Sequence, residues 1–205
     1  MEFPKTLIKR NGYIERIKPF MRKNIAKVLT GQRRVGKSFL LYQLMDQLLV
    51  EEPDANIIYI NFEDFAFSHI QTAEDMHAYI MSKFRKEKYN YIFVDEIQEI
   101  VNFERVIRSL LLNENNDIYI TGSNAKMLSG ELATYLSGRY IEFSVYSLSY
   151  LEFLAFHKLE NNNESLYLYS RYGGLPYLIN LPLKDETVNE YLKSVYSVSY
   201  THLTL

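Results

Sequence analysis

The eight residues from Gly31 to Ser38 (GQRRVGKS) constrain this chain more than any other stretch, because they match the pattern G-x-x-x-x-G-K-[ST]. The two glycines permit backbone angles that turn successive N–H groups inward on a phosphate. Lys37 is long enough to reach the β- and γ-phosphates of a nucleotide, and the Ser38 hydroxyl can bind Mg²⁺. The stretch therefore predicts a loop that binds a nucleoside triphosphate with magnesium.

The sequence on either side supplies the setting that this pattern requires. Residues 25–30 (IAKVLT) form a short apolar run typical of a buried strand. Residues 39–49 place leucine and methionine at the 3.6-residue spacing of a helix that faces a core, and the positive end of its dipole would favour phosphate. The expected nucleotide contacts are Gly31, Gln32, Arg33, Arg34, Val35, Gly36, Lys37, Ser38 and Phe39.

A second motif, residues 89–96 (YNYIFVDE), predicts a buried strand that ends in two carboxylates. Mg²⁺ prefers oxygen ligands, usually one or two carboxylates together with substrate phosphates. Asp95 is therefore predicted to hold the metal with Ser38. Glu96, one residue further along, points elsewhere and is predicted to activate the attacking water as a general base.

A third apolar run, residues 56–62, is expected to be a strand covered on both faces of its sheet. It ends in Glu63 and Asp64, at the carboxyl edge where open α/β sheets bind ligands. Two interpretations stay open for these carboxylates. Either they orient a water molecule or contact magnesium through a water molecule, or they simply face solvent.

Strands and helices alternate throughout residues 25–143. Helices are expected to begin at Thr72, with Asp75 completing a capping box, and at Asn102. Further strands are expected at 117–124 and 140–143. The alternation predicts an α/β fold, the three-layer αβα sandwich of P-loop nucleotide triphosphatases with a mostly parallel sheet. We place this core at residues 25–146.

Polar residues close the strand 117–124. Ser123 or Asn124 could hydrogen-bond the γ-phosphate or the attacking water, or this stretch could form only a turn. A helix is expected at 125–136, and Arg139 follows it directly before the next strand. Arg139 cannot easily reach the γ-phosphate of its own chain, so it either acts on a neighbouring subunit as an arginine finger or forms a surface ion pair.

The segments outside the core are expected to be helical. Residues 1–24 form a basic N-terminal segment, which either stacks on the nucleotide base or caps the sheet edge. After residue 146, Ser149 and Glu152 form a capping box, and a last helix is expected to begin at Thr187. We interpret residues 147–196 as a small helical lid.

The last nine residues, 197–205, lack an apolar period that would continue the last helix. We expect this tail to be non-native, the end of a truncated gene model.

Composition excludes several classes of protein. The chain has no cysteine, which rules out disulfides and thiolate metal sites, and its four histidines are scattered without metal-ligand spacing. No apolar run approaches the ~20 residues of a membrane span, and the N-terminus lacks a signal peptide, so a cytoplasmic location is expected.

Charge is uneven along the chain. The formal net charge is only −2, but the first 37 residues contain eleven Lys and Arg against two Glu. This basic segment is either a solvated face beside a triphosphate site or a DNA-contacting arm that includes Arg10, Arg16, Lys18 and Arg22.

Several stretches together resemble the AAA+ superfamily of ATPases, in particular a prokaryotic branch whose ATPase core is followed by a C-terminal region of unknown function. The matching segments are TGQRRVGKS at 30–38 (Walker A), FVDEIQ at 93–98 (Walker B), TGSN at 121–124, SGR at 137–139, SLSYLEF at 147–153 and YGGLP at 172–176. Members of that branch look roughly twice as long as this chain.

The resemblance implies Lys37, Ser38, Asp95 and Glu96 as the hydrolytic set, and Asn124, or else Ser123, as the sensor of the γ-phosphate. It implies Arg139 as the arginine finger in a homo-oligomer. It also implies Gly174 and Pro176 as a lid turn near the adenosine, and ATP with Mg²⁺ as cofactors.

Three functions fit these features. The first is Mg-dependent ATP hydrolysis coupled to a conformational change. The second is a nucleotide-dependent switch or DNA-associated adaptor with little hydrolysis. The third, a small-molecule kinase, is disfavoured by Asp95-Glu96 and by the position of Arg139.

Overall fold

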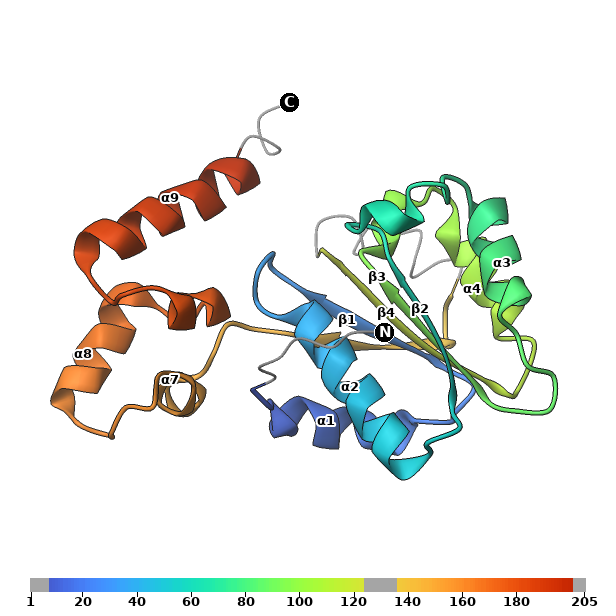
Figure 1. Cartoon of the computed structure of the whole chain (residues 1–205), viewed down its shortest axis with the longest axis horizontal. Helices are drawn as coiled ribbons and strands as arrows, with labels where there is room; N and C mark the ends of the chain where they lie inside the picture. The colour runs from blue at the N-terminus through green and yellow to red at the C-terminus, as the bar shows by residue number, and fades with distance from the viewer. Residues whose placement is uncertain (1–7, 124–135, 201–205) are drawn as a thin grey trace. The chain divides into compact units, whose positions relative to one another are not determined.

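The computed structural model describes residues 8–123 and 136–200, and the chain divides after Val145 into two compact units (Figure 1). The first unit contains a sheet of five parallel strands in the order β2-β3-β4-β1-β5. The strands are β1 (Ala26–Gly31), β2 (Asn56–Asn61), β3 (Asn90–Asp95), β4 (Asn116–Ser123) and β5 (Tyr140–Ser144). This sheet confirms the predicted α/β fold.

Helices cover both faces of the sheet (Figure 1). On one face lie α1 (Asn11–Ile17), followed by the short 3₁₀ turn η1 (Lys18–Phe20), and α2 (Lys37–Glu51). On the other lie α3 (Ala73–Ser82) and α4 (Phe103–Leu110). Two more 3₁₀ turns follow strand ends, η2 (Phe65–Phe67) after β2 and η3 (Ile97–Glu99) after β3. The three layers are those of the predicted sandwich.

The core is built from strand side chains, which point alternately to the two faces of the sheet. Val28, Ile92 and Ile120 belong to one buried cluster with Ile80 of α3 and Ile107 of α4. Their neighbours in sequence point to the opposite face, because successive side chains of a strand alternate. β1, β3 and β4 are buried at nearly every position, as expected of central strands covered on both sides.

The expectation that residues 56–62 are covered on both faces is wrong for part of this strand. β2 lies at the edge of the sheet, and its residues alternate between buried and half-buried. Ile58 and Ile60 join the core cluster, while Ile57 and Tyr59 on the opposite face are only partly covered. A continuous apolar run therefore did not reveal which strand has only one neighbour.

A buried ion pair joins β1 to β4 near the amino ends of the strands. The Lys27 ammonium contacts Asp117, and both side chains have no solvent exposure. The Asp117 carboxylate also accepts hydrogen bonds from the Tyr119 hydroxyl (2.8 Å) and from the Arg22 backbone N–H (2.8 Å). Burial lowers the pKa of Lys27, and the charge of Asp117 opposes that shift.

Helix starts agree with the sequence in part. The capping boxes at Thr72 and Ser149 are present. Asn102 precedes α4, but its backbone is left-handed (φ 61°) and its side chain makes no capping hydrogen bond, so that prediction was wrong in mechanism. The last helix, α9 (Asp185–Tyr200), begins two residues before Thr187 and continues past residue 197. The helix predicted at 125–136 lies almost entirely outside the described residues.

The second unit contains α7 (Tyr150–His157), α8 (Asn163–Tyr172), the 3₁₀ turn η4 (Pro176–Asn180) and α9. Asp185 at the start of α9 accepts hydrogen bonds from Arg171 and, at 2.8 Å, from the Tyr172 hydroxyl. A Cβ at Gly174 would lie 2.2 Å from the Leu148 carbonyl oxygen, so this glycine is required by packing inside the unit. None of the helices within residues 8–123 and 136–200 has the length and apolarity to cross a bilayer.

Candidate active site

The loop between β1 and α2 has the geometry that its glycines were expected to allow. Gly31 ends β1 with φ +153°, and a Cβ built there would lie 2.3 Å from the Val145 carbonyl oxygen and 3.2 Å from Val35 Cγ2. Gly36, the residue before α2, has φ +95°. Arg34 between them also adopts a left-handed backbone, φ 66°. The chain therefore curls tightly before the helix begins, as a phosphate-binding loop requires.

Lys37 brings the loop and the acidic strand end together. Its side chain is 4% exposed, and its ammonium donates to the carbonyl oxygens of Gly31 (3.1 Å) and Gln32 (3.3 Å). The same nitrogen lies 3.6 Å from Glu96 Oε1. Two motifs far apart in the sequence thus meet at the carboxyl edge of the sheet.

Asp95 lies at the end of β3, only 1% exposed. The Thr121 hydroxyl donates to Asp95, and the Ser38 hydroxyl lies near enough to the carboxylate to lower its pKa. Burial raises the pKa of Asp95, and the charge of Glu96 raises it further, against the opposing effect of these hydroxyls and of Lys37. Asp95 and Ser38, the two residues predicted to hold magnesium, therefore lie near each other.

Thr121 is a site residue to which the sequence analysis gave no role. β4 lies between β1 and β3, so Thr121 stands between the loop and the acidic residues. Its hydroxyl accepts from the Glu96 backbone N–H at 3.0 Å while it donates to Asp95. The available signal was a hydroxyl in the otherwise apolar run after Ile118.

Glu96 is held in an unusual backbone conformation. Its φ of 53° and ψ of 48° are left-handed, which costs a non-glycine residue free energy. The Gln98 side-chain amide donates to the Glu96 carboxylate. Gln98 Oε1 is buried and has no hydrogen-bond partner among the described residues. Glu96 therefore faces Lys37 from a fixed direction, with Gln98 on its other oxygen.

The two carboxylates that follow β2 have different environments. Burial raises the pKa of Glu63, and the charges of Glu96 and Asp95 raise it further, while Arg33 and Lys37 oppose the shift. Arg33 lies 4.0 Å from Glu63. The Glu63 side chain is 64% exposed, so it faces solvent while the charges of Asp95 and Glu96 still act on it, and neither interpretation is excluded.

Asp64, in contrast, caps η2, because its carboxylate accepts from the Ala66 backbone N–H at 2.9 Å. On the first turn of α2, Phe39 is about half exposed (48%) and packs edge-on against Tyr42. Its side chain is thus accessible to a ligand. The Val35 side chain is buried, so only its backbone is available to phosphate.

The charges at this edge fit a divalent cation. The carboxylates of Glu96 and Asp95 raise the pKa of Glu63, and Glu96 also raises that of Asp95, while the Lys37 charge opposes both shifts and Arg33 opposes the first. Among the described residues, no group of three or more His, Cys, Asp or Glu side chains forms a ready-made metal cage. Mg²⁺ commonly takes one or two carboxylates and completes its coordination with phosphate and water.

The remaining predicted residues lie further from this centre or outside the described chain. Ser123 pairs with Gly31 in the sheet register, which puts it beside the loop. Asn124 follows it and lies outside the described residues. Arg139 is exposed at the amino end of β5, where its carbonyl accepts from the Ala26 N–H at 2.9 Å. The loop is at the other end of β1, about 17 Å away at the rise of a parallel strand, so Arg139 does not serve the site of its own chain.

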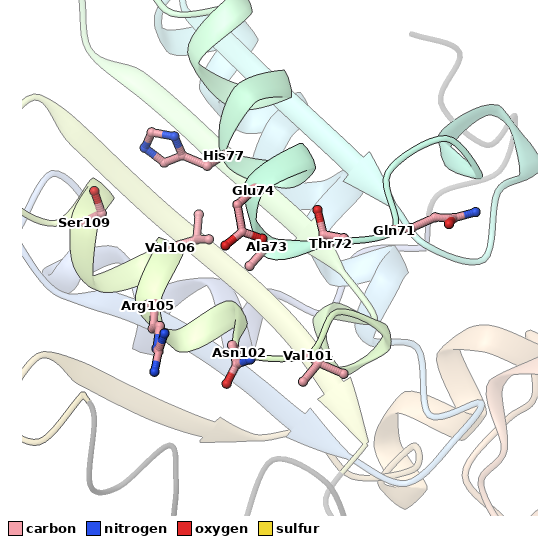
Figure 2. Close-up of a pocket in the computed structure, with 10 residues that line it drawn as sticks. All are labelled: Gln71, Thr72, Ala73, Glu74, His77, Val101, Asn102, Arg105, Val106 and Ser109. Carbon is pink, nitrogen blue, oxygen red and sulfur yellow. The ribbon is translucent and has the colours of Figure 1, made fainter.

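A separate cleft of about 520 Å³ lies between α3 and α4 (Figure 2). None of the residues that line it was predicted to bind nucleotide or metal, and the cleft is distinct from the phosphate loop. The lining residues are Gln71, Thr72, Ala73, Glu74, His77, Val101, Asn102, Arg105, Val106 and Ser109.

The parallel sheet, the loop at 31–38 and the acidic end of β3 define a P-loop nucleotide-binding fold. A family model described as "AAA domain" matches residues 23–154, and the chain belongs to this family. The resemblance to the AAA+ superfamily is thereby confirmed.

Curated relatives share the sequence over most of the chain. An uncharacterized protein of Haemophilus influenzae is 36% identical over 206 residues, covering 97% of this chain and 52% of the relative. An uncharacterized protein of Methanocaldococcus jannaschii is 30% identical over 188 residues, covering 84% of this chain and 41% of the relative. The chain thus spans about half the length of these relatives or less.

Solved structures share the fold at low sequence identity. Cdc6p from Pyrobaculum aerophilum aligns with a TM-score of 0.57 at 14% identity, covering 98% of this chain and 65% of that one. AMPPCP-bound DnaA from Aquifex aeolicus aligns with a TM-score of 0.56 at 15% identity, covering 85% of this chain and 61% of that one. The Aeropyrum pernix ORC1 protein in complex with DNA aligns with a TM-score of 0.53 at 12% identity, covering 74% of this chain and 49% of that one. At these identities the comparison supports the fold.

Proposed function

We propose that this protein binds ATP with Mg²⁺ and hydrolyses it, using the released energy to change conformation. One observation carries the proposal: the Lys37 ammonium of the loop lies 3.6 Å from Glu96 at the acidic end of β3. A phosphate-binding loop and an acidic strand end so arranged match the needs of phosphoryl transfer to water. The AMPPCP-bound state of the similarly folded DnaA supports a nucleotide as ligand.

Each residue has a defined task in the proposed reaction. The backbone N–H groups of the loop and the Lys37 ammonium bind the β- and γ-phosphates, and Lys37 exchanges its present carbonyl partners for phosphate oxygens. Ser38 and Asp95 would hold Mg²⁺, which neutralises charge on the phosphates when it is bound. Phe39 lies on the exposed side of the loop helix, where it is available to the nucleoside.

Glu96 accepts the proton of the attacking water. The water oxygen bonds to the γ-phosphorus, the bond from that phosphorus to the β,γ-bridging oxygen breaks, and ADP and inorganic phosphate leave. The proton on Glu96 then passes to solvent. Gln98 and Lys37 each contact one oxygen of the Glu96 carboxylate, so binding of phosphate by Lys37 frees one of these oxygens for the water.

The conformational step rests on residues predicted from the sequence. Asn124 is proposed to report the γ-phosphate, Gly174 and Pro176 to line a lid turn near the adenosine, and Arg139 to complete the site of a neighbouring subunit. Sedimentation with and without Mg-ATP tests the last point. A protein that stays monomeric at saturating ATP while retaining full turnover would eliminate Arg139 as a finger acting in trans.

The decisive variant is Glu96→Gln. It keeps the shape of the side chain but cannot accept a proton, so turnover should fall by about 10²- to 10⁴-fold while Mg-ATP affinity is kept. Phosphate release and calorimetric titration measure the two quantities. Asp64→Asn is the matched control, because Asp64 is a neighbouring strand-end carboxylate that only caps η2. Unchanged turnover in Glu96→Gln would remove Glu96 from the mechanism, and no heat with Mg-ATP would reject the whole proposal.

The alternative, a nucleotide-dependent switch or DNA-associated adaptor, keeps some support from the similar fold of ORC1 in its complex with DNA. It needs a revised contact surface, because Arg10 is buried and Arg22 hydrogen-bonds Tyr91. Arg16 and Lys18 are exposed. Neutralising both should weaken DNA binding and reduce its salt dependence. DNA affinity that ignores these changes would reject the alternative.

A further inference from the structure

Arg10 reaches the phosphate loop from outside. It immediately precedes α1, and it is only 5% exposed. Its Nη1 donates to the Val35 carbonyl oxygen at 3.1 Å, and its guanidinium carbon lies 4.7 Å from the centre of the Tyr13 ring. Its backbone N–H donates to Gln43 Oε1 on α2 at 2.9 Å. The side chain is thus held on two sides and directed at one carbonyl of the loop.

That carbonyl belongs to the peptide that joins Val35 to Gly36. In a trans peptide the C=O of one residue and the N–H of the next point in opposite directions. Because Arg10 holds the Val35 oxygen, the Gly36 N–H points away from Arg10, and the pattern predicts that the N–H groups of this loop face the phosphates. A charged donor makes this bond stronger than one between neutral groups.

We propose that Arg10 is a positioning residue for triphosphate binding, which fixes the Val35–Gly36 peptide so that the Gly36 N–H faces the phosphate. This inference rests on the proposed function, since it assigns Arg10 to the same loop. It also explains why a guanidinium is buried here, since burial of a charge is costly unless strong hydrogen bonds compensate for it. Arg10 acts on the phosphates only through the loop.

The test compares Arg10→Met with Arg16→Met. Arg16 is a matched control, because it is an exposed arginine whose guanidinium lies near the same Tyr13 ring, at 5.9 Å. Calorimetry measures the affinities for Mg-ATP and for inorganic tripolyphosphate with Mg²⁺. We expect Arg10→Met to weaken both by about the same factor, roughly tenfold, as loss of one charge-assisted hydrogen bond implies. Arg16→Met should leave both within twofold.

A spectroscopic readout separates positioning from general destabilisation. The chain has eight glycines, so ¹⁵N-glycine labelling gives a simple amide spectrum. In ligand-free Arg10→Met the Gly36 signal should shift, while Gly138 and Gly173 keep their wild-type positions. Arg10→Lys retains a cationic donor and should recover part of the lost affinity, because Lys lacks the planar guanidinium geometry of Arg.

The outcomes are distinguishable. If the wild-type protein binds neither Mg-ATP nor tripolyphosphate, the proposed function fails. If it binds both and Arg10→Met binds equally well with an unmoved Gly36 signal, only the role of Arg10 is overturned. An affinity loss for ATP without one for tripolyphosphate would also overturn it, since Arg10 would then act on the nucleoside. Shifts across all glycine signals would mean that Arg10 is merely structural.

Discussion

Gly31→Ala tests whether the close packing at the start of the loop is required for function. Gly31 is the last residue of β1, and its carbonyl oxygen accepts a hydrogen bond from the Lys37 ammonium. An added Cβ would lie 2.3 Å from the Val145 carbonyl oxygen, about 1.1 Å inside the 3.4 Å at which ordinary contact begins. The Val145 N–H donates to the Thr30 carbonyl at 2.7 Å, so Val145 is tied to the same strand and cannot simply move away.

The loop itself must therefore shift by about 1 Å. A displacement of that size in a positioning element costs on the order of 10²-fold in turnover. Overpacking of a filled site costs roughly 1–3 kcal/mol of folding free energy. For a chain of this length each kcal/mol lowers the thermal midpoint by about 2–4 °C. We expect Gly31→Ala to melt several degrees lower and to lose most of its ATPase activity.

Phosphate release and scanning calorimetry measure these effects, and two glycines provide controls. Gly138 has φ +71° but nothing within 4 Å of a built Cβ, so Gly138→Ala reports the backbone cost without a clash. Its Mg-ATP affinity should match wild type. Gly12 in α1 is also unobstructed, and Gly12→Ala should stabilise slightly, by up to about 1 kcal/mol. A Gly31→Ala protein with wild-type melting and turnover would refute the packing argument.

Three further perturbations address buried polar groups. Burial raises the pKa of Asp95, so the folded state binds an extra proton, and stability falls as pH rises from near 4, the ordinary pKa, through the raised pKa. Melting curves of ligand-free Asp95→Asn should lack this contribution to the pH dependence and should show a higher melting temperature than wild type at pH 8. The same variant should lose the magnesium dependence of ATP binding. Gln98→Leu removes a donor to Glu96 together with its own unpaired buried oxygen, so turnover should fall about tenfold at unchanged ATP affinity and unchanged melting temperature. Lys27→Met leaves Asp117 buried without its cation, so the free energy of unfolding measured in urea should fall by about 3–5 kcal/mol. A fall of less than about 1 kcal/mol would contradict this prediction.

The sequence predicted the elements of the site whose residues are adjacent along the chain. The loop at 31–38 and the strand end at 95–96 are local patterns with fixed chemistry, and both lie where expected. The order of the strands in the sheet, in contrast, is not encoded in any local pattern. It depends on how whole helices cross the sheet, so the apolar run of β2 gave no sign that this strand forms an edge.

Residues that act across the sheet could not be predicted in this way. Thr121 reaches Asp95 only because β4 inserts between β1 and β3. Arg10 was grouped with a basic segment predicted to be either a solvated face or a DNA-contacting arm, since a count of charges does not show which one is buried. Both contacts depend on residues distant in sequence, and a single sequence carries no record of such pairs. Glu63 was ambiguous for the same reason, because its neighbours Glu96 and Asp95 come from another strand.

The first unit buries polar charge at both edges of its sheet, and the two clusters differ in balance. At the amino edge Lys27 meets Asp117, so opposite charges offset each other inside the protein. At the carboxyl edge two buried carboxylates, Asp95 and Glu96, lie beside one buried cation, Lys37, and the pKa of Asp95 is raised by burial and by the charge of Glu96. A buried excess of negative charge destabilises the ligand-free fold, and a bound divalent cation would relieve it. Buried charge alone therefore does not mark a binding site. We expect uncompensated buried charge to mark one, and in this unit such charge lies at the carboxyl ends of the strands, beside the phosphate loop.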